Sequence, residues 1–298
     1  MWQSLLHELK EGNQKSLARC ISLIENEVTG YEEFLQSIPA GASPVIGITG
    51  PPGAGKSTMV DSLIAELVDA GKKVAVLCVD PSSPFNLGAL LGDRIRMSSW
   101  YNHPHVFIRS LATRGSLGGL HQKILEITDL CKAALFDYVI IETVGVGQSE
   151  IEIAGLADIT VVVLVPESGD EVQTMKAGLM EIADLFVVNK ADRPDADLFV
   201  KNLRLMLAPA FATSKQEIPV IKTIATQKRG AKELWLKIDE LLQQHHINER
   251  RSWLLTEKAY YLMQQKRMKD VHKKELKQSI EAAMSKGNFN LYQFIKNK

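Results

Sequence analysis

The sequence predicts an α/β fold: a mostly parallel sheet covered by helices, with helical extensions at both ends of the chain. Short apolar runs alternate with longer stretches of helical periodicity, which is typical of parallel strands joined by crossover helices. The chain has 298 residues, 45% of them hydrophobic and 23% charged, which suits one α/β domain of about 200 residues with appendages. The predicted strands are Val45–Thr49, Val74–Val79, His105–Arg109, Tyr138–Ile141, Thr160–Val165, Leu185–Val188 and Pro219–Thr223.

Helical patterns precede, separate and follow these strands. Leu17, Ile21, Ile24 and Val28 recur at helical spacing before "PAGASP" breaks the pattern near Ser43. The helices between the strands are predicted near Thr58–Ala70, Leu117–Lys132, Val172–Ile182, Asp195–Leu207 and Ala231–His245. Beyond residue 246 the chain has the pattern of two or three helices broken at "SKGN". We therefore expect an N-terminal helical extension (1–43), an α/β domain (44–246) and a C-terminal helical segment (247–298).

The charges balance over the whole chain but are unevenly distributed. With 35 Lys/Arg and 35 Asp/Glu, no overall field favours nucleic acid as a partner. From Glu249 to the end, 12 basic and 5 acidic residues leave a local charge of +7. This segment is either a solvated helical face or a surface that docks onto an acidic partner.

No feature of the sequence indicates a disulfide framework, a zinc site or a membrane segment. Cys20, Cys78 and Cys131 are far apart, with no C-x-x-C pair. The most apolar run, "ITVVVLV", is too short to span a bilayer, and the first residues lack a signal-peptide pattern. We therefore expect a soluble cytoplasmic protein.

The stretch "VIGITGPPGAGKST" indicates a phosphate-binding loop. A strand leads into Gly50-x-x-x-x-Gly55-Lys56-Ser57, and a helical pattern follows, which is the context that this motif requires. Backbone N–H groups can surround a phosphate there, Lys56 can reach the β- and γ-phosphates, and the Ser57 hydroxyl can bind Mg²⁺. The α/β domain is therefore predicted to be a P-loop NTPase. Its nucleotide-contacting residues are Gly50, Pro51, Pro52, Gly53, Ala54, Gly55, Lys56, Ser57 and Thr58.

A second motif predicts which base the nucleotide carries. The strand "LFVV" ends in Asn189-Lys190-x-Asp192. A carboxylate at Asp192 can accept hydrogen bonds from guanine N1–H and from its exocyclic amino group, whereas adenine would leave this charge facing an acceptor. The predicted ligands are therefore GTP and GDP.

Acidic residues near the ends of predicted strands indicate a Mg²⁺ site. "YVIIETVGVGQSE" contains Glu142-x-x-Gly145, Asp80 ends the strand before "PSSP", and Asp93 follows in "LGDRIRM". Mg²⁺ retains water molecules that need carboxylate acceptors, and ligands bind at the carboxyl ends of strands in such sheets. Ser57 and Glu142 are therefore predicted at the metal. Asp80 is a candidate contact to a metal-bound water or to the attacking water, and Asp93, in a long loop, is a further candidate.

The order of several motifs resembles that of the MeaB/ArgK family, which comprises GTPase chaperones of adenosylcobalamin-dependent methylmalonyl-CoA mutase. These motifs are "TGPPGAGKST", "VDPSSP", "GDRIRM", "RGSLGGL", "IETVGVGQSE", "GDEVQTMKAG" and "VVNKAD". The resemblance covers roughly residues 43 to 242. It implies that GTP binding and hydrolysis gate cofactor loading and protect the mutase from inactivation.

The resemblance also implies roles for individual residues. Ser57, Asp80, Asp93 and Glu142 would surround the metal, and the loops 81–96, 144–150 and 168–176 would respond to the nucleotide. Lys56, Asp80 and Glu142 are the catalytic candidates, and the attacking water could be positioned by Asp80, Glu142 or Gln148. In the third loop, Asp170, Gln173 and Lys176 would sense the nucleotide or the partner, unless they only begin a helix.

One stretch departs from the family pattern. Where the family has Ser-Ala-Leu against the guanine, this chain has "KTIATQKRG", so that Ile224 replaces the serine. Ala225 remains, and its backbone N–H could still reach guanine O6. We assign Ile224, Ala225 and Thr226 to the base-side loop.

The expected partners are an adenosylcobalamin-dependent acyl-CoA mutase and a second copy of this chain. The apolar residues of the C-terminal segment must bury surface somewhere, and a symmetric dimer is the commonest solution. Two other functions stay open: a nickel-type metallocentre insertion GTPase, although His or Cys tracts are absent, and a regulatory module that binds GTP without hydrolysing it.

We predict that Asp192→Asn weakens binding of GTP relative to xanthosine triphosphate. An asparagine amide can donate a hydrogen bond to the C2 oxygen of xanthine. The variant therefore becomes complementary to xanthine and loses its complementarity to guanine. A competition titration with both nucleotides measures the effect. Equal weakening of both would remove the assignment of Asp192 to base reading.

Overall fold

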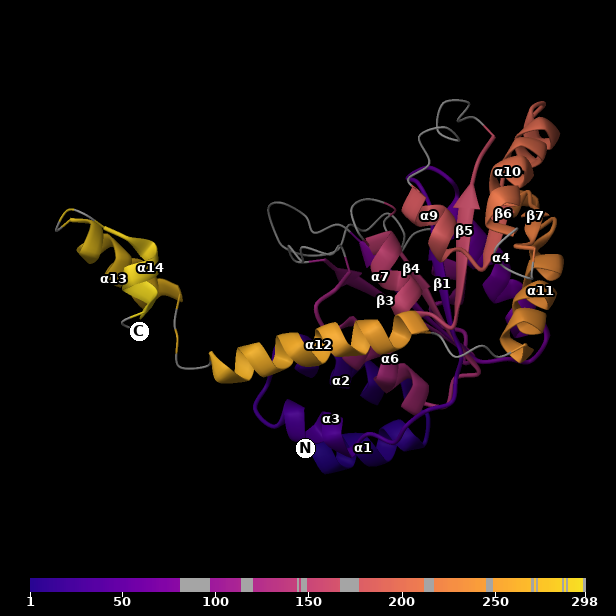
Figure 1. Cartoon of the computed structure of the whole chain (residues 1–298). Helices are drawn as coiled ribbons and strands as arrows, with labels where there is room; N and C mark the ends of the chain where they lie inside the picture. The colour runs from indigo at the N-terminus through magenta and orange to yellow at the C-terminus, as the bar shows by residue number, and fades with distance from the viewer. Residues whose placement is uncertain are drawn as a thin grey trace. The chain divides into compact units, whose positions relative to one another are not determined.

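The computed structural model describes residues 1–80, 97–113, 120–143, 145, 149–166, 177–211, 217–244, 249–268, 271, 273–285, 287 and 289–296. These residues form two compact units, Met1–Arg251 and Ser252–Lys298, and Figure 1 colours the chain from indigo to yellow. The division into three parts that the sequence suggested stays a prediction.

The first unit contains a seven-stranded sheet in the order β3-β2-β4-β1-β5-β6-β7, with all neighbouring strands parallel. The strands are β1 Val45–Thr49, β2 Val74–Asp80, β3 Val106–Ala112, β4 Tyr138–Glu142, β5 Ile159–Leu164, β6 Leu185–Val188 and β7 Val220–Lys222. The predicted α/β class is confirmed.

The strand β3 extends further than the predicted strand His105–Arg109. Its last residues continue the ladder with β2, since Leu111 pairs with Val79 and Ala112 with Asp80. Pairing with a neighbouring strand therefore sets the end of β3, and a local apolar pattern does not contain this information.

Helices cover both faces of the sheet, as the continuous apolar strands require. On β5, Val161 and Val163 belong to the core beneath α4 (Lys56–Asp69) and α11 (Ala231–Gln243). Val162 and Leu164 belong to the opposite core beneath α9 (Ala177–Ile182) and α10 (Ala196–Phe211). Because side chains alternate between the two faces of a strand, every position of this run is buried.

Two helices on the second face differ from the sequence prediction. The helix α6 spans Ile124–Ala133, so it begins later than predicted, and residues 117–119 lie outside the described part. The helix α7 (Ser149–Leu156) was not predicted, because "SEIEIAGL" alternates apolar and polar residues like a strand. It packs on β1, where a side chain on Gly47 would clash with Ile153. Tertiary packing therefore decides the conformation of this segment.

The N-terminal helices form a layer against α6. They are α1 (Trp2–Lys10), α2 (Gln14–Glu25) and α3 (Tyr31–Ser37), and Figure 1 shows them gathered beneath α6. The Asn13 side chain caps α2 by accepting from the backbone N–H groups of Lys15 and Ser16. Leu17, Ile21 and Ile24 are fully buried, which confirms the predicted apolar stripe at these three positions.

The second unit contains the rest of α12 (Glu249–Arg267), then α13 (Lys273–Met284) and α14 (Leu291–Lys296). Many of its large apolar side chains are exposed, among them Trp253, Tyr260, Met263, Tyr292 and Ile295.

Short 3₁₀ turns in the first unit are η1 (Ser98–Trp100) and η2 (Ala225–Gln227). Across the described ranges, each helix is too short or too polar to cross a membrane.

Candidate nucleotide-binding site

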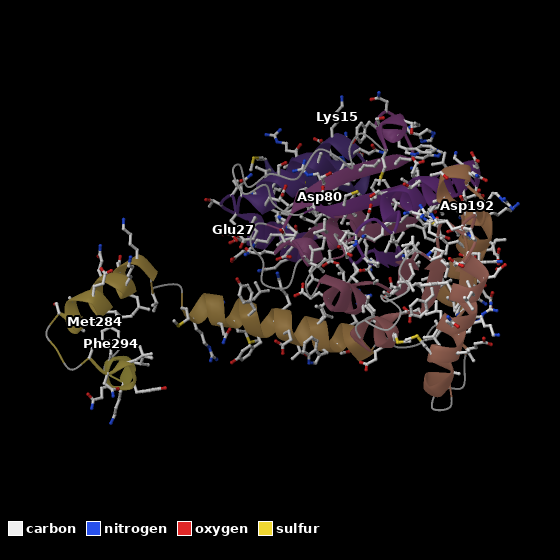
Figure 2. The ribbon with its side chains drawn as sticks, turned by 90° about the horizontal axis from the view of Figure 1, so that it is seen from above. Lys15, Glu27, Asp80, Asp192, Met284 and Phe294 are labelled. Atoms are coloured by element: carbon white, nitrogen blue, oxygen red, sulfur yellow. The ribbon has the colours of Figure 1, made fainter. Side chains whose placement is uncertain are left out.

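The predicted site residues follow the carboxyl ends of several strands, which lie along one edge of the parallel sheet. Asp80 ends β2, Glu142 ends β4, and Asn189 follows β6. Figure 2, seen from above, shows Asp80 and Asp192 well apart, and the strand order puts β4, β1 and β5 between β2 and β6. The candidate site therefore has a phosphate and metal side and a separate base side.

The phosphate loop connects Thr49, at the end of β1, to Lys56, at the start of α4. Gly50 has a φ of 138°, and a Cβ there would lie 2.1 Å from the Val163 carbonyl oxygen. Only glycine fits this close approach of two backbones. The tip of the loop, Pro52 and Gly53, is exposed, and Ala54 is buried. The loop is thus held at its base and open at its tip.

Lys56 is buried beneath the loop that it follows. Its Nζ donates to the carbonyl oxygens of Gly50 (2.9 Å) and Pro51 (3.1 Å). These bonds hold the charge of the ammonium group directly under the loop. The positive end of α4 lies at the same place.

On the metal side, two of the predicted ligands touch. Ser57 Oγ donates to Glu142 Oε1 at 2.6 Å, and both residues are buried. Asp80 is buried at the end of the adjacent strand, two residues beyond Cys78, which pairs with Glu142. Hydroxyl and carboxylate oxygens are the ligands that Mg²⁺ prefers, so these residues fit this ion. Over the described residues, no three His, Cys, Asp or Glu side chains converge on one point.

The turn after Glu142 packs tightly against the phosphate loop. The Thr143 and Thr49 hydroxyls, both buried, are hydrogen-bonded at 2.8 Å. Gly145 has a φ of 84°, and a Cβ there would lie 2.0 Å from the Gly50 carbonyl oxygen and 2.8 Å from Lys56 Nζ. The backbone of Gly145 therefore lies close to the place where Lys56 would hold a phosphate group.

On the base side, the buried Asn189 amide joins three segments. Its Nδ2 donates to the Ala54 carbonyl (2.9 Å), and its Oδ1 accepts from the Thr223 hydroxyl (3.2 Å) and from the Ala225 N–H (3.1 Å). The phosphate loop and the base-side loop are thus connected through one side chain.

The other two residues of the Asn-Lys-x-Asp motif lie in a turn. Lys190 has a φ of 56°, its carbonyl accepts from the Arg193 N–H (3.1 Å), and the Ala191 N–H bonds to the Thr223 carbonyl. Asp192 is exposed and lines an open cavity of about 850 Å³ that extends to Lys201 and Arg204 of α10. Its carboxylate is accessible to a ligand at this edge.

The base-side loop is hydrogen-bonded to Asn189 through the Ala225 peptide. The Ala225 N–H, expected to reach guanine O6, donates to Asn189 Oδ1 in this structure. Ile224 is buried and Thr226 is exposed. A guanine oxygen would have to share or take over the Ala225 donor.

Several predicted residues lie outside the described part of the chain. They are Asp93 with its loop 81–96, Val144 and residues 146–148 of the second loop, and Asp170, Gln173 and Lys176 of the third. Their assignment rests on the sequence alone.

The sequence reasoning missed the hydroxyl groups that organise the site. Thr49, Thr143 and Thr223 all end or follow an apolar strand, are nearly fully buried, and bond within the site. A threonine directly after an apolar strand beside a motif residue was the available signal.

Within the described part of the chain, His103, Cys20 and Cys131 have structural surroundings. His103 Nδ1 accepts from the His105 N–H (3.3 Å) within its own turn, so that this side chain caps the loop. Burial raises the pKa of Cys20 to about 11 and raises the pKa of Cys131 further, so that both thiols are protonated near neutral pH.

A wholly parallel sheet, with a glycine-rich loop and Lys56-Ser57 between its strand β1 and helix α4, defines a P-loop NTPase. Comparison with known proteins identifies the group within this class. The family described as methylmalonyl Co-A mutase-associated GTPase MeaB matches residues 17–284. The chain belongs to this family of GTPases, for which guanine-nucleotide binding is expected, and the resemblance found in the motifs is confirmed.

Individual relatives agree with this assignment. A Pyrococcus abyssi protein is 44% identical over 294 residues, which cover 97% of this chain and 89% of the relative. The GTPase ArgK of Escherichia coli is 37% identical over 241 residues, covering 77% and 72%. Among solved structures, an LAO/AO transport system kinase superposes with a TM-score of 0.67 at 26% identity, over 99% of this chain and 95% of that one.

We predict that Gly145→Ala abolishes most nucleotide turnover. The added Cβ overlaps the Gly50 backbone, and a displacement of about 1 Å at such a site costs about 100-fold in rate. The matched control is Gly71→Ala, since Gly71 has a φ of 74° and nothing within 4 Å of the new Cβ. The control should lose only about 1–2 kcal/mol of stability. Equal phosphate release by both variants would contradict the close packing of Gly145.

Proposed function

We propose that this protein binds and hydrolyses GTP, and that it gates the loading of adenosylcobalamin onto a mutase of the methylmalonyl-CoA type or a related acyl-CoA mutase. The contact between Ser57 and Glu142 beside the buried Lys56 carries the proposal for hydrolysis. Family membership supports the choice of partner, because the family is described as mutase-associated.

Each residue has a defined task in the proposed reaction. Lys56 would leave the Gly50 and Pro51 carbonyls and hold the β- and γ-phosphates, together with the loop N–H groups. Ser57, Asp80 and Glu142 would hold Mg²⁺, with Asp93 as a further candidate. When bound, Mg²⁺ neutralises the charge that develops on the phosphate oxygens. Asp192 would accept hydrogen bonds from guanine, and Asn189 would keep the base side aligned with the phosphate loop.

We expect slow turnover by the protein alone. No arginine can be assigned from the sequence to the developing phosphate charge, and such a residue supplied in trans accelerates related enzymes by about 10³–10⁵-fold. A partner that completes the site would couple hydrolysis to its own state. This suits a protein whose target is another protein.

The alternative of metallocentre insertion lacks support from the parts of the chain that the structure describes. They contain no group of three His, Cys, Asp or Glu side chains that could carry such a metal. Measurement of phosphate release distinguishes our proposal from the alternative of a module that binds GTP without hydrolysing it.

We predict that Lys56→Ala lowers single-turnover phosphate release by about 10²–10³-fold, the scale for removal of one transition-state donor. Ser57→Ala should also lose activity and regain part of it at high Mg²⁺, since the lost oxygen is one of several ligands. The control is Lys73→Ala, at an exposed lysine directly before β2. Wild-type turnover in Lys56→Ala would contradict the assignment.

The same assay tests the partner. Adding purified methylmalonyl-CoA mutase should accelerate phosphate release by the wild-type protein. Identical rates with and without mutase would argue against this partner. Absence of release in both would favour the non-hydrolysing module.

We further propose that the second unit forms a homodimer. It exposes large apolar side chains such as Trp253, Tyr260 and Ile295, which a symmetric contact would bury.

Ending the chain after Arg251 keeps the ion pair between Arg251 and Asp158 (3.1 Å) and removes the whole second unit. We predict a folded, GTP-binding monomer with impaired coupling to the mutase, whereas the full-length chain should be a dimer by light scattering. A monomeric full-length chain, or a truncated chain that unfolds, would overturn this proposal.

A further inference from the structure

The base-side loop is held from a helix that begins at the phosphate loop. This loop follows β7 and contains Ile224, Ala225 and Thr226. Its Ala225 N–H bonds to Asn189 Oδ1, while its Ala225 carbonyl accepts from the Lys228 N–H (3.1 Å) and from Ser62 Oγ (2.8 Å). The Ser62 hydroxyl thus provides a hydrogen bond from outside the loop to the Ala225 carbonyl at its centre.

Ser62 lies in the middle of α4 and is 1% exposed. A serine there usually bonds back to the carbonyl four residues earlier, and Thr58 O lies 3.0 Å from its Oγ. The hydroxyl has a single hydrogen to donate, and the shorter contact is the one to Ala225. The hydroxyl therefore links α4 to a loop 163 residues away in the sequence.

The same helix begins with Lys56 and Ser57. A rigid helix that carries Ser62 thus joins the phosphate side to the base side, and the bond from Asn189 to the Ala54 carbonyl forms a second connection. The side chain of Ile224 is apolar and buried, so it cannot supply a hydrogen bond to this loop, whose Ile224 contacts run through the backbone. Ser62 supplies a hydroxyl from another element.

We propose that Ser62 is a positioning residue for guanine recognition: it fixes the Ala225 peptide, and through it the base-side loop, relative to the phosphate loop. This inference rests on the proposed function, because it requires that the nucleotide is GTP and that its base meets Asp192 and the loop at 224–226.

The test compares Ser62→Ala with the wild-type full-length protein. Alanine is the best helix former, so the substitution does not weaken α4 itself. Removal of one buried hydrogen bond should weaken GTP binding by about 3- to 10-fold. It should raise KM for GTP and leave kcat unchanged, since the phosphate side is untouched. Binding of inorganic triphosphate, which has no base, should stay within about twofold.

The control variant is Thr128→Val. Thr128 is equally buried, but its hydroxyl bonds only within its own helix α6, to the Ile124 carbonyl (2.6 Å). Titration calorimetry with GTP and with inorganic triphosphate, together with melting temperatures, should give wild-type nucleotide binding for this control.

Three outcomes would overturn the inference. One is unchanged GTP affinity in Ser62→Ala, and another is an equal loss for GTP and for triphosphate, which would indicate general destabilisation. The third is wild-type protein that does not bind GTP, which would overturn the proposed function as well. The first two leave the proposed function intact.

Discussion

The hydrogen bonds of the buried Asn189 amide connect the two sides of the nucleotide site. They join the Ala54 carbonyl of the phosphate loop to Thr223 and Ala225 beyond β7. These groups are buried, and an unpaired polar group there costs about 1–3 kcal/mol. The two loops are therefore held together by the protein's own groups, which would reduce the ordering that binding of a nucleotide requires. The separation between phosphate and base positions is set in advance.

The parallel sheet supplies the frame in which this connection works. Its strands bring Thr49, Asp80, Glu142 and Asn189 to one edge. The hydroxyl pair of Thr49 and Thr143 then holds the Glu142 turn against the phosphate loop. Because both ends of the pair are buried, movement of the turn must disturb the loop. Such mechanical contact is what a protein needs if hydrolysis is to be reported to a partner.

The two units differ in how much of their apolar surface is buried. The first unit buries a large apolar core on each side of its sheet and carries the candidate nucleotide site. The second unit leaves apolar side chains exposed, and the segment from Glu249 onward is strongly basic. Under the proposed function, the first unit would process the nucleotide and the second would serve assembly.

The sequence by itself determined the α/β class, the seven strands and the family, because apolar runs and the spacing of Gly50, Lys56 and Asp192 are local properties of the chain. It did not determine α7, whose alternating pattern favours a strand, nor the last residues of β3, which depend on pairing with β2. The bonds from Thr49 to Thr143 and from Ser62 to Ala225 join residues 94 and 163 positions apart. Only the tertiary structure decided them, because a hydroxyl can bond only to an acceptor that packing brings within about 3 Å.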